Sequence, residues 1–146
     1  MLSKKILALF LFISLTTIIF SQGKQQFADI GNFKLENGGE ILNCTIGYRT
    51  YGKMNADKSN IIIFPTWFGG TTKGLEGLIG PGKIADSTKF YIISLDALGD
   101  GVSSSPSNSK KQPNNSFPLF TVRDMVNSQH LLLTKHFSML PVLRYE

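Results

Sequence analysis

The chain contains many serines, but none has the setting that acyl-transfer chemistry requires. A serine nucleophile for acyl transfer commonly lies at the centre of a glycine-x-serine-x-glycine turn between a strand and a helix, and this pattern is absent from the 146 residues. Ser103, Ser104 and Ser105 stand in a loop between Gly101 and Pro106. Serines in such loops commonly hydrogen-bond the backbone of a turn. We therefore expect no catalytic residue in this sequence.

Two histidines and one cysteine complete the groups that commonly do chemistry. His130 and His136 are six residues apart on a predicted helix, so they project about 120° apart and do not easily share a metal ion. Cys44 lies in an apolar, strand-like run and is predicted to be a buried small hydrophobe. The glycines before Lys83 lack the spacing of a phosphate-binding loop. The sequence thus predicts no metal site and no cofactor.

Two segments are candidates for a binding site, because each follows an apolar run with the character of a buried strand. Phe68, Gly69 and Gly70 belong to the first segment, where adjacent glycines let a ligand approach the backbone closely. Asp96 begins the second, and functional residues of open α/β sheets often follow the ends of strands. We take these four residues as candidates for lining a pocket. Trp67 and Phe68 have an alternative role as anchors in the hydrophobic core.

The elements that must position these residues follow an α/β pattern. The apolar runs at 60–64 and 90–95 do not alternate with polar residues, which is typical of strands buried on both faces of a parallel sheet. Before them, Phe33–Leu35 and Leu42–Tyr51 flank a turn signal at 37–39 and predict an antiparallel hairpin. Residues 96–116 form a long polar loop. The order is hairpin, parallel strands joined by a crossover, and helix.

The helix is predicted from Thr121 to about Phe137. The Thr121 hydroxyl can cap its start, and Asp124 favours the positive end of the helix dipole. Side chains at helical spacing predict one buried stripe: Val122, Met125, Val126, Gln129, Leu132 and Leu133. Within the glycine-rich crossover we expect only a short helix, from Pro81 through Ala85.

The first 21 residues have the layout of a secretory signal peptide. Lys4 and Lys5 precede an almost wholly apolar run from Ile6 to Phe20, and Ser21 supplies a small residue before a polar stretch. Fifteen residues fall short of the roughly 30 Å core of a bilayer, which argues against an uncleaved anchor. A buried N-terminal helix is a third interpretation. We expect an exported protein, periplasmic or secreted, whose domain spans 22–146 and which meets the membrane only through this leader.

The net charge gives no sign of a nucleic-acid partner. It is +5 for the whole sequence and +3 after residue 21, because the leader holds two lysines and no acidic residue. Lys110-Lys111 is a pair and not a basic patch. The single cysteine cannot form an internal disulfide, so stability must come from packing.

Several short blocks are informative together. They are, in order, Ile61–Gly70, Leu78–Gly82, Leu98–Gly101 with Ser103–Ser107, Phe117-Pro118, and Thr121–Val126. In this order and spacing they resemble the N-terminal half of α/β-hydrolase-fold proteins of the homoserine O-acetyltransferase group. The resemblance covers roughly residues 33–136.

The resemblance implies a family that transfers acyl groups through a serine ester, with an acyl donor such as acetyl-CoA or an ester. It also implies that the loop after the strand at 60–64 supplies an oxyanion-binding N–H, with Trp67 at the matching position. The group commonly reads histidine-alanine-leucine-threonine-glycine here, so Pro65-Thr66-Trp67-Phe68 argues against homoserine as acceptor.

The resemblance also indicates what is missing. The strand and elbow serine expected after His136 have no counterpart, so the fold is predicted to be truncated before its nucleophile and the chain alone to be inactive. A small secreted binding or accessory module, and a non-functional gene fragment, are the alternatives. In the full fold the strand at 60–64 lies beside the strand that carries the serine. Without that neighbour its apolar edge is bare, and we expect self-association and poor solubility.

Overall fold

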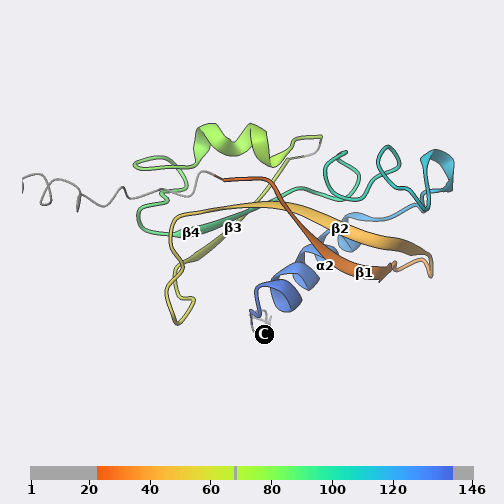
Figure 1. Ribbon diagram of the computed structural model, residues 1–146, viewed down its shortest axis with the longest axis horizontal. Helices are drawn as coiled ribbons and strands as arrows, with labels where there is room; N and C mark the ends of the chain where they lie inside the picture. Colours follow the sequence, from red (N-terminus) through yellow and green to blue (C-terminus); the bar gives the residue numbers. More distant parts are fainter. Residues whose placement is uncertain (1–22, 68, 140–146) are drawn as a thin grey trace, which may run out of the picture.

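The structure, a computed structural model, describes residues 23–67 and 69–139. Its centre is a four-stranded mixed sheet in the order β1-β2-β4-β3 (Figure 1). The strands are β1 (Gln26–Lys34), β2 (Glu40–Tyr51), β3 (Ile61–Pro65) and β4 (Tyr91–Leu95). β2 pairs antiparallel with both β1 and β4, whereas β3 and β4 run parallel. The predicted order of hairpin and parallel strands is confirmed.

The hairpin is longer than its sequence signals indicate. β1 begins at Gln26 instead of near Phe33, and its pairing with β2 shifts register on both sides of Gly31. These irregularities break the strict alternation of buried and exposed side chains by which a strand is recognised in sequence. At the turn, the Asn37 side-chain oxygen accepts a hydrogen bond from the Gly39 N–H (2.9 Å).

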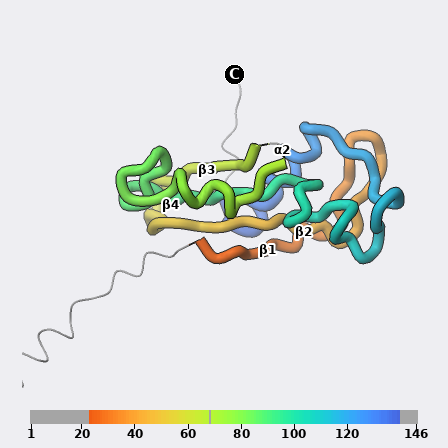
Figure 2. Tube along the Cα trace, turned by 90° about the horizontal axis from the view of Figure 1, so that it is seen from above, coloured from red at the N-terminus to blue at the C-terminus, as the bar shows by residue number. Residues whose placement is uncertain are grey.

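β4 is an inner strand with apolar side chains on both faces. Ile92 faces one hydrophobic cluster and Ile93 and Leu95 face the other, and all three are fully buried. β3 lies beside β4, but Ile61 to Phe64 remain half-buried. Figure 2 shows β1 and β3 at opposite edges of the sheet. In the described part of the chain, the predicted bare edge at 61–64 is therefore present.

Helical segments cover both faces of the sheet (Figure 1). The 3₁₀ helix η1 (Thr72–Leu78) packs Leu75 into the smaller cluster. On the other face, α2 (Val122–Leu131) continues as the π-helical η3 (Leu132–His136), whose first residue is fully buried in the larger cluster. The long polar loop at 96–116 is present as predicted and contains the short 3₁₀ helix η2 (Asn114–Ser116).

The helix begins and ends where the sequence predicts, but its buried stripe is wrong in part. Val122 and Val126 are 75% and 55% exposed. The fully buried row is instead Asp124, Ser128 and Leu132, spaced four residues apart. Periodicity identifies an apolar face, but it does not tell which side of that face meets the sheet.

The predicted cap is a reciprocal capping box. The Asp124 N–H donates to Thr121 Oγ1 (3.2 Å), and the Thr121 N–H donates to Asp124 Oδ2 (2.8 Å). Asp124 Oδ1 also accepts from the Glu36 N–H (3.0 Å), which ties the helix to the hairpin. Burial by itself raises the pKa of the Asp124 carboxyl, but these hydrogen bonds outweigh it and hold the pKa below its usual value.

The crossover between β3 and β4 differs from the expectation. Residues 72–78 form η1, and Pro81–Ala85 forms a turn instead of the expected short helix. The Gly80 N–H donates to the Ala85 oxygen (3.0 Å) and the Ala85 N–H to the Leu78 oxygen (3.2 Å). These backbone groups are used in a local bridge, so they do not form helical bonds.

The predicted signal peptide falls outside the described residues. Among the helices of the described ranges, none combines the length and the apolar character needed to cross a bilayer.

Candidate functional site

Residues 66–71, which we call the β3–η1 loop, leave the sheet beside the end of β4. The Thr66 N–H donates to the Leu95 carbonyl oxygen (3.1 Å), so the pairing of β3 with β4 continues into the loop. The chain then turns, and the Gly70 N–H donates to the Trp67 carbonyl oxygen (2.9 Å). The start of the loop is therefore fixed to the sheet, and its middle is closed by a turn.

Trp67 is the only tryptophan of the chain and projects from this loop. Its side chain is 56% exposed, so the alternative role as a core anchor is wrong for Trp67. The indole lies over two glycines: a Cβ on Gly70 would come within 2.6 Å of the ring, and a Cβ on Gly74 within 3.2 Å. Within the described ranges, no acceptor takes a hydrogen bond from the Trp67 backbone N–H.

The predicted pocket residues of the loop have different settings. Gly69 is exposed and has φ +73°, a left-handed conformation that favours glycine. Gly70 is buried beneath the indole. Phe68 lies outside the described residues. Two hollows of the described surface, one beside Thr45 and one beside Arg49, are lined by other residues.

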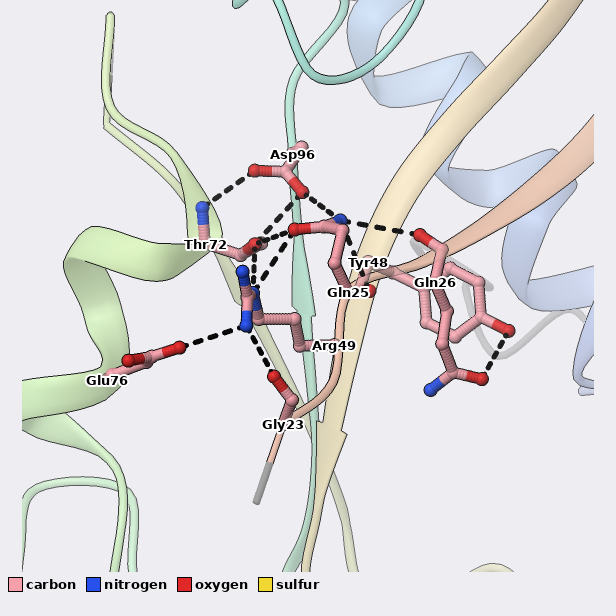
Figure 3. A network of polar contacts seen from close by, with 8 residues as sticks. All are labelled: Gly23, Gln25, Gln26, Tyr48, Arg49, Thr72, Glu76 and Asp96. Carbon is pink, nitrogen blue, oxygen red and sulfur yellow. Dashed lines mark hydrogen bonds and ion pairs between the residues drawn. The ribbon is translucent and has the colours of Figure 1, made fainter. Parts of the chain in front are cut away.

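Asp96 directly follows β4 and is fully buried (Figure 3). Its Oδ1 accepts a hydrogen bond from the Thr72 N–H (2.6 Å). Its Oδ2 accepts from the Thr72 hydroxyl and from Gln25 Nε2, both at 2.9 Å. The structure thus brings Asp96 to the end of the β3–η1 loop, but it encloses the carboxylate instead of leaving it at an open pocket.

Arg49 of β2 completes this polar cluster (Figure 3). Its Nε donates to Gln25 Oε1 and to Thr72 Oγ1, at 3.1 Å each. Its Nη1 pairs with Glu76 Oε1 of η1 (2.9 Å). A positive charge close to the buried Asp96 carboxylate lowers the cost of removing that carboxylate from water. Sequence analysis did not identify Gln25, Arg49 or Thr72 as members of a site.

Ser103 and Ser104 of the polar loop hydrogen-bond backbone groups, as the sequence predicts, but the N–H groups that they accept from belong to β2 and not to a turn. Ser103 Oγ accepts from the Gly47 N–H (2.9 Å) and donates to the Asp96 carbonyl oxygen (2.7 Å). Ser104 Oγ accepts from the Thr45 N–H (2.9 Å). Both hydroxyls therefore fasten the start of the loop to β2.

Comparison with known proteins places this chain among esterases and acetyltransferases. It is 39% identical over 119 residues to a probable esterase of Corynebacterium glutamicum and 38% identical over 119 residues to an ethyl acetate hydrolase of Pseudomonas veronii. Each match covers 80% of this chain and 34% of the relative. A homoserine O-acetyltransferase of Methanohalophilus mahii is 39% identical over 118 residues, which is 69% of this chain and 24% of that protein. No protein-family model matches the chain.

Solved structures agree with these relatives. The acetyl esterase MekB superposes with a TM-score of 0.75 at 38% identity, and an acetylester hydrolase from Corynebacterium glutamicum with 0.74 at 39%. Each comparison covers 80% of this chain and 34% of the other. The chain is homologous to the N-terminal portion of esterases and homoserine O-acetyltransferases, and its structural neighbours have the α/β-hydrolase fold. It spans about a third of the length of the curated relatives that it matches, in their N-terminal portion, where the sequence suggested a half.

The remaining reactive side chains of this α/β-hydrolase-fold chain lie apart from the β3–η1 loop. His136 Nε2 is 2.7 Å from the Tyr48 hydroxyl, at the end of η3, and His130 is exposed on α2. Cys44 is fully buried in the core, and this burial raises the pKa of its thiol to about 12, so it is no nucleophile at neutral pH. In the described ranges, no cluster of three or more potential metal ligands occurs.

Proposed function

We propose that the β3–η1 loop provides an oxyanion-binding N–H of a serine esterase or acyltransferase, and that this chain forms the first part of such an active site. The observation that carries the proposal is the Trp67 N–H. Trp67 comes directly after Thr66, whose N–H fixes the loop to β4 through its hydrogen bond to Leu95. Within the described ranges, the Trp67 N–H has no acceptor of its own. A fixed backbone N–H stabilises the negative charge that develops on a carbonyl oxygen during acyl transfer.

The reaction needs parts beyond this loop. A serine oxygen attacks the acyl carbon, the carbonyl oxygen becomes the oxyanion, and the bond to the leaving alcohol breaks as that alcohol takes a proton from a histidine. Water then releases the acyl group in an esterase, and another alcohol accepts it in a transferase. The sequence has no glycine-x-serine-x-glycine turn to supply the serine, so we propose that the chain alone does not turn over an ester.

We propose small acetyl esters as the substrate class of the complete site, with acetyl-CoA as the donor if the complete protein is a transferase. The names of the first two relatives support this: a probable esterase and an ethyl acetate hydrolase match 80% of the chain at 39% and 38% identity. The loop sequence Pro65-Thr66-Trp67-Phe68 supports water in preference to homoserine as acceptor.

A chimera tests the role of the loop. Residues 23–139 would replace the matching N-terminal portion of the Pseudomonas veronii ethyl acetate hydrolase, which keeps its own downstream sequence. We expect the chimera to hydrolyse p-nitrophenyl acetate and to be labelled by a fluorophosphonate, because the loop supplies the oxyanion N–H that the replaced segment supplied.

The matched control is the same chimera with the parent's nucleophilic serine changed to alanine, which should lose both signals. A chimera that shows a sharp thermal transition but no turnover would contradict the proposed role of the loop. Ester turnover by the purified 146-residue chain alone, abolished by the fluorophosphonate, would contradict its proposed inactivity.

Export is part of the proposal and rests on residues 1–21, where a lysine pair precedes an apolar run and a small residue. We expect the protein recovered from its host to begin at Gln22 and to be found outside the cytoplasm. Intact-mass measurement of the recovered protein checks this. A mass that includes the first 21 residues would argue for a retained anchor or an internal helix.

A further inference from the structure

We propose that Asp96 is a positioning residue for the Trp67 N–H, which it acts on by fixing the far end of the β3–η1 loop. The effect on catalysis rests on the proposed oxyanion role of that loop. The effect on structure, that the buried carboxylate determines the conformation of the loop, can be tested without it.

The loop is held at both ends by consecutive residues of one strand end. The Leu95 carbonyl oxygen accepts a hydrogen bond from the Thr66 N–H (3.1 Å). Asp96 accepts from the Thr72 N–H through Oδ1 (2.6 Å) and from the Thr72 hydroxyl through Oδ2 (2.9 Å). Trp67 is the residue after the first of these attachments. Since β4 is a buried inner strand, both attachments have a rigid base.

The carboxylate cannot easily move away from this position. The Asp96 N–H donates to the Gly47 carbonyl oxygen (2.9 Å), and Gln25 Nε2 donates to Oδ2 (2.9 Å). Gly47 leaves room for the carboxylate, because a Cβ at that position would come within 2.8 Å of Oδ2. Arg49 donates to both Thr72 Oγ1 and Gln25 Oε1, so the two partners of the carboxylate are themselves oriented.

This site uses two acceptor oxygens, and an amide side chain offers only one. Asp96 accepts three hydrogen bonds through two oxygens, from two groups of Thr72 and one of Gln25. An asparagine has a single acceptor oxygen, so it can satisfy the Thr72 N–H, but its amino group would then face the amino group of Gln25, donor against donor. Loss of charge-assisted bonds at a loop end should release the loop locally.

The single tryptophan makes the loop conformation measurable in the full chain. For Asp96→Asn we expect the Thr72 amide to exchange with deuterium about tenfold faster or more. We also expect acrylamide to quench Trp67 fluorescence more strongly, since the indole packs over Gly70 and Gly74 at the released end. Both are measured well below the thermal transition of each variant.

Asp124→Asn is the matched control, because Asp124 is also a buried carboxylate that accepts several hydrogen bonds, but it lies at the start of α2. It should leave the Thr72 exchange and the Trp67 quenching unchanged even where it lowers stability. If Asp96→Asn changes the two signals no more than Asp124→Asn does, the inference is wrong.

Gly47→Ala provides a second variant that removes no hydrogen-bonding group from the cluster. Its Cβ would lie 2.8 Å from Asp96 Oδ2 and from Val102 Cγ1, and 3.0 Å from Gln25 Nε2. It would therefore crowd the carboxylate and its Gln25 partner, and should change Trp67 quenching in the same direction as Asp96→Asn. An unchanged signal in a folded Gly47→Ala protein would count against the carboxylate as the determinant of the loop.

Activity separates this inference from the proposed function. In an active chimera, Asp96→Asn should lower kcat with little change in KM, because the oxyanion forms after substrate binding. If Trp67 quenching and Thr72 exchange change but kcat does not, Asp96 positions the loop and the oxyanion role of Trp67 is wrong. If the quenching and the exchange are also unchanged, the positioning role of Asp96 is wrong.

Discussion

Replacing Trp67 by proline in the active chimera is expected to lower kcat by about 10²–10³-fold, the usual cost of losing one oxyanion donor. Proline has no backbone N–H, so the change removes the proposed donor itself. Trp67→Ala is the matched comparison, since it removes the indole, which is 56% exposed, and retains the N–H. We expect the alanine variant to keep most of the activity. Steady-state hydrolysis of p-nitrophenyl acetate measures both.

Proline also restricts the backbone, so the fold must be checked in parallel. Thermal unfolding of the two variants should show similar midpoints, because the loop is outside the hydrophobic clusters. If neither variant loses activity, the N–H is not an oxyanion donor. An equal loss in both variants would also contradict the donor role and would indicate that the indole contacts the substrate.

The predicted mature chain, residues 22–146, is expected to self-associate through the edge of β3, and Ile62→Lys should shift it strongly toward monomer. In the described part of the chain, β3 is an edge strand with half-buried apolar side chains, and such an edge pairs readily with another copy. A lysine in the middle of the strand places a charge where a second strand would approach. Sedimentation at several protein concentrations measures the change in mass.

Ile84→Lys is the control for apolar surface in general. Ile84 is 81% exposed and lies in the turn before β4, outside the strands of the sheet. If association depends on the β3 edge, this variant should associate as the unsubstituted chain does. A monomer with a sharp thermal transition, before any substitution, would contradict the prediction.

The parts of the fold with simple periodicity could be predicted from sequence. The unbroken apolar runs near Ile62 and Ile93 identified two neighbouring parallel strands, and Thr121 with Asp124 located the start of the helix. The first strand was predicted too short because register shifts around Gly31 interrupt its pattern. η1 was missed since its glycine content is unfavourable to helix, and tertiary contacts of Leu75 outweigh that propensity.

The site was only partly predictable for a different reason. Asp96 was predicted to line a pocket because it follows a buried strand, and Trp67 to supply an oxyanion N–H because its surrounding block resembles a known family. The structure encloses Asp96, and the role of Trp67 stays a prediction. The partners of Asp96 come from segments far away in sequence, and no local pattern links Gln25 or Thr72 to it. Arg49 offered one unused signal: a charged side chain in an otherwise apolar strand needs a partner when the strand is an inner one.

The Gln25–Asp96 hydrogen bond joins residues that are 71 positions apart in sequence, and this separation has a consequence for biosynthesis. Gln25 leaves the ribosome early, and at about 5–20 residues per second its partner follows only after roughly 4–14 seconds. Throughout that interval the N-terminal segment has no native carboxylate to bind. If residues 1–21 act as the predicted leader, a translocation machinery that accepts only unfolded polypeptide would meet the segment behind them before this enclosure can form.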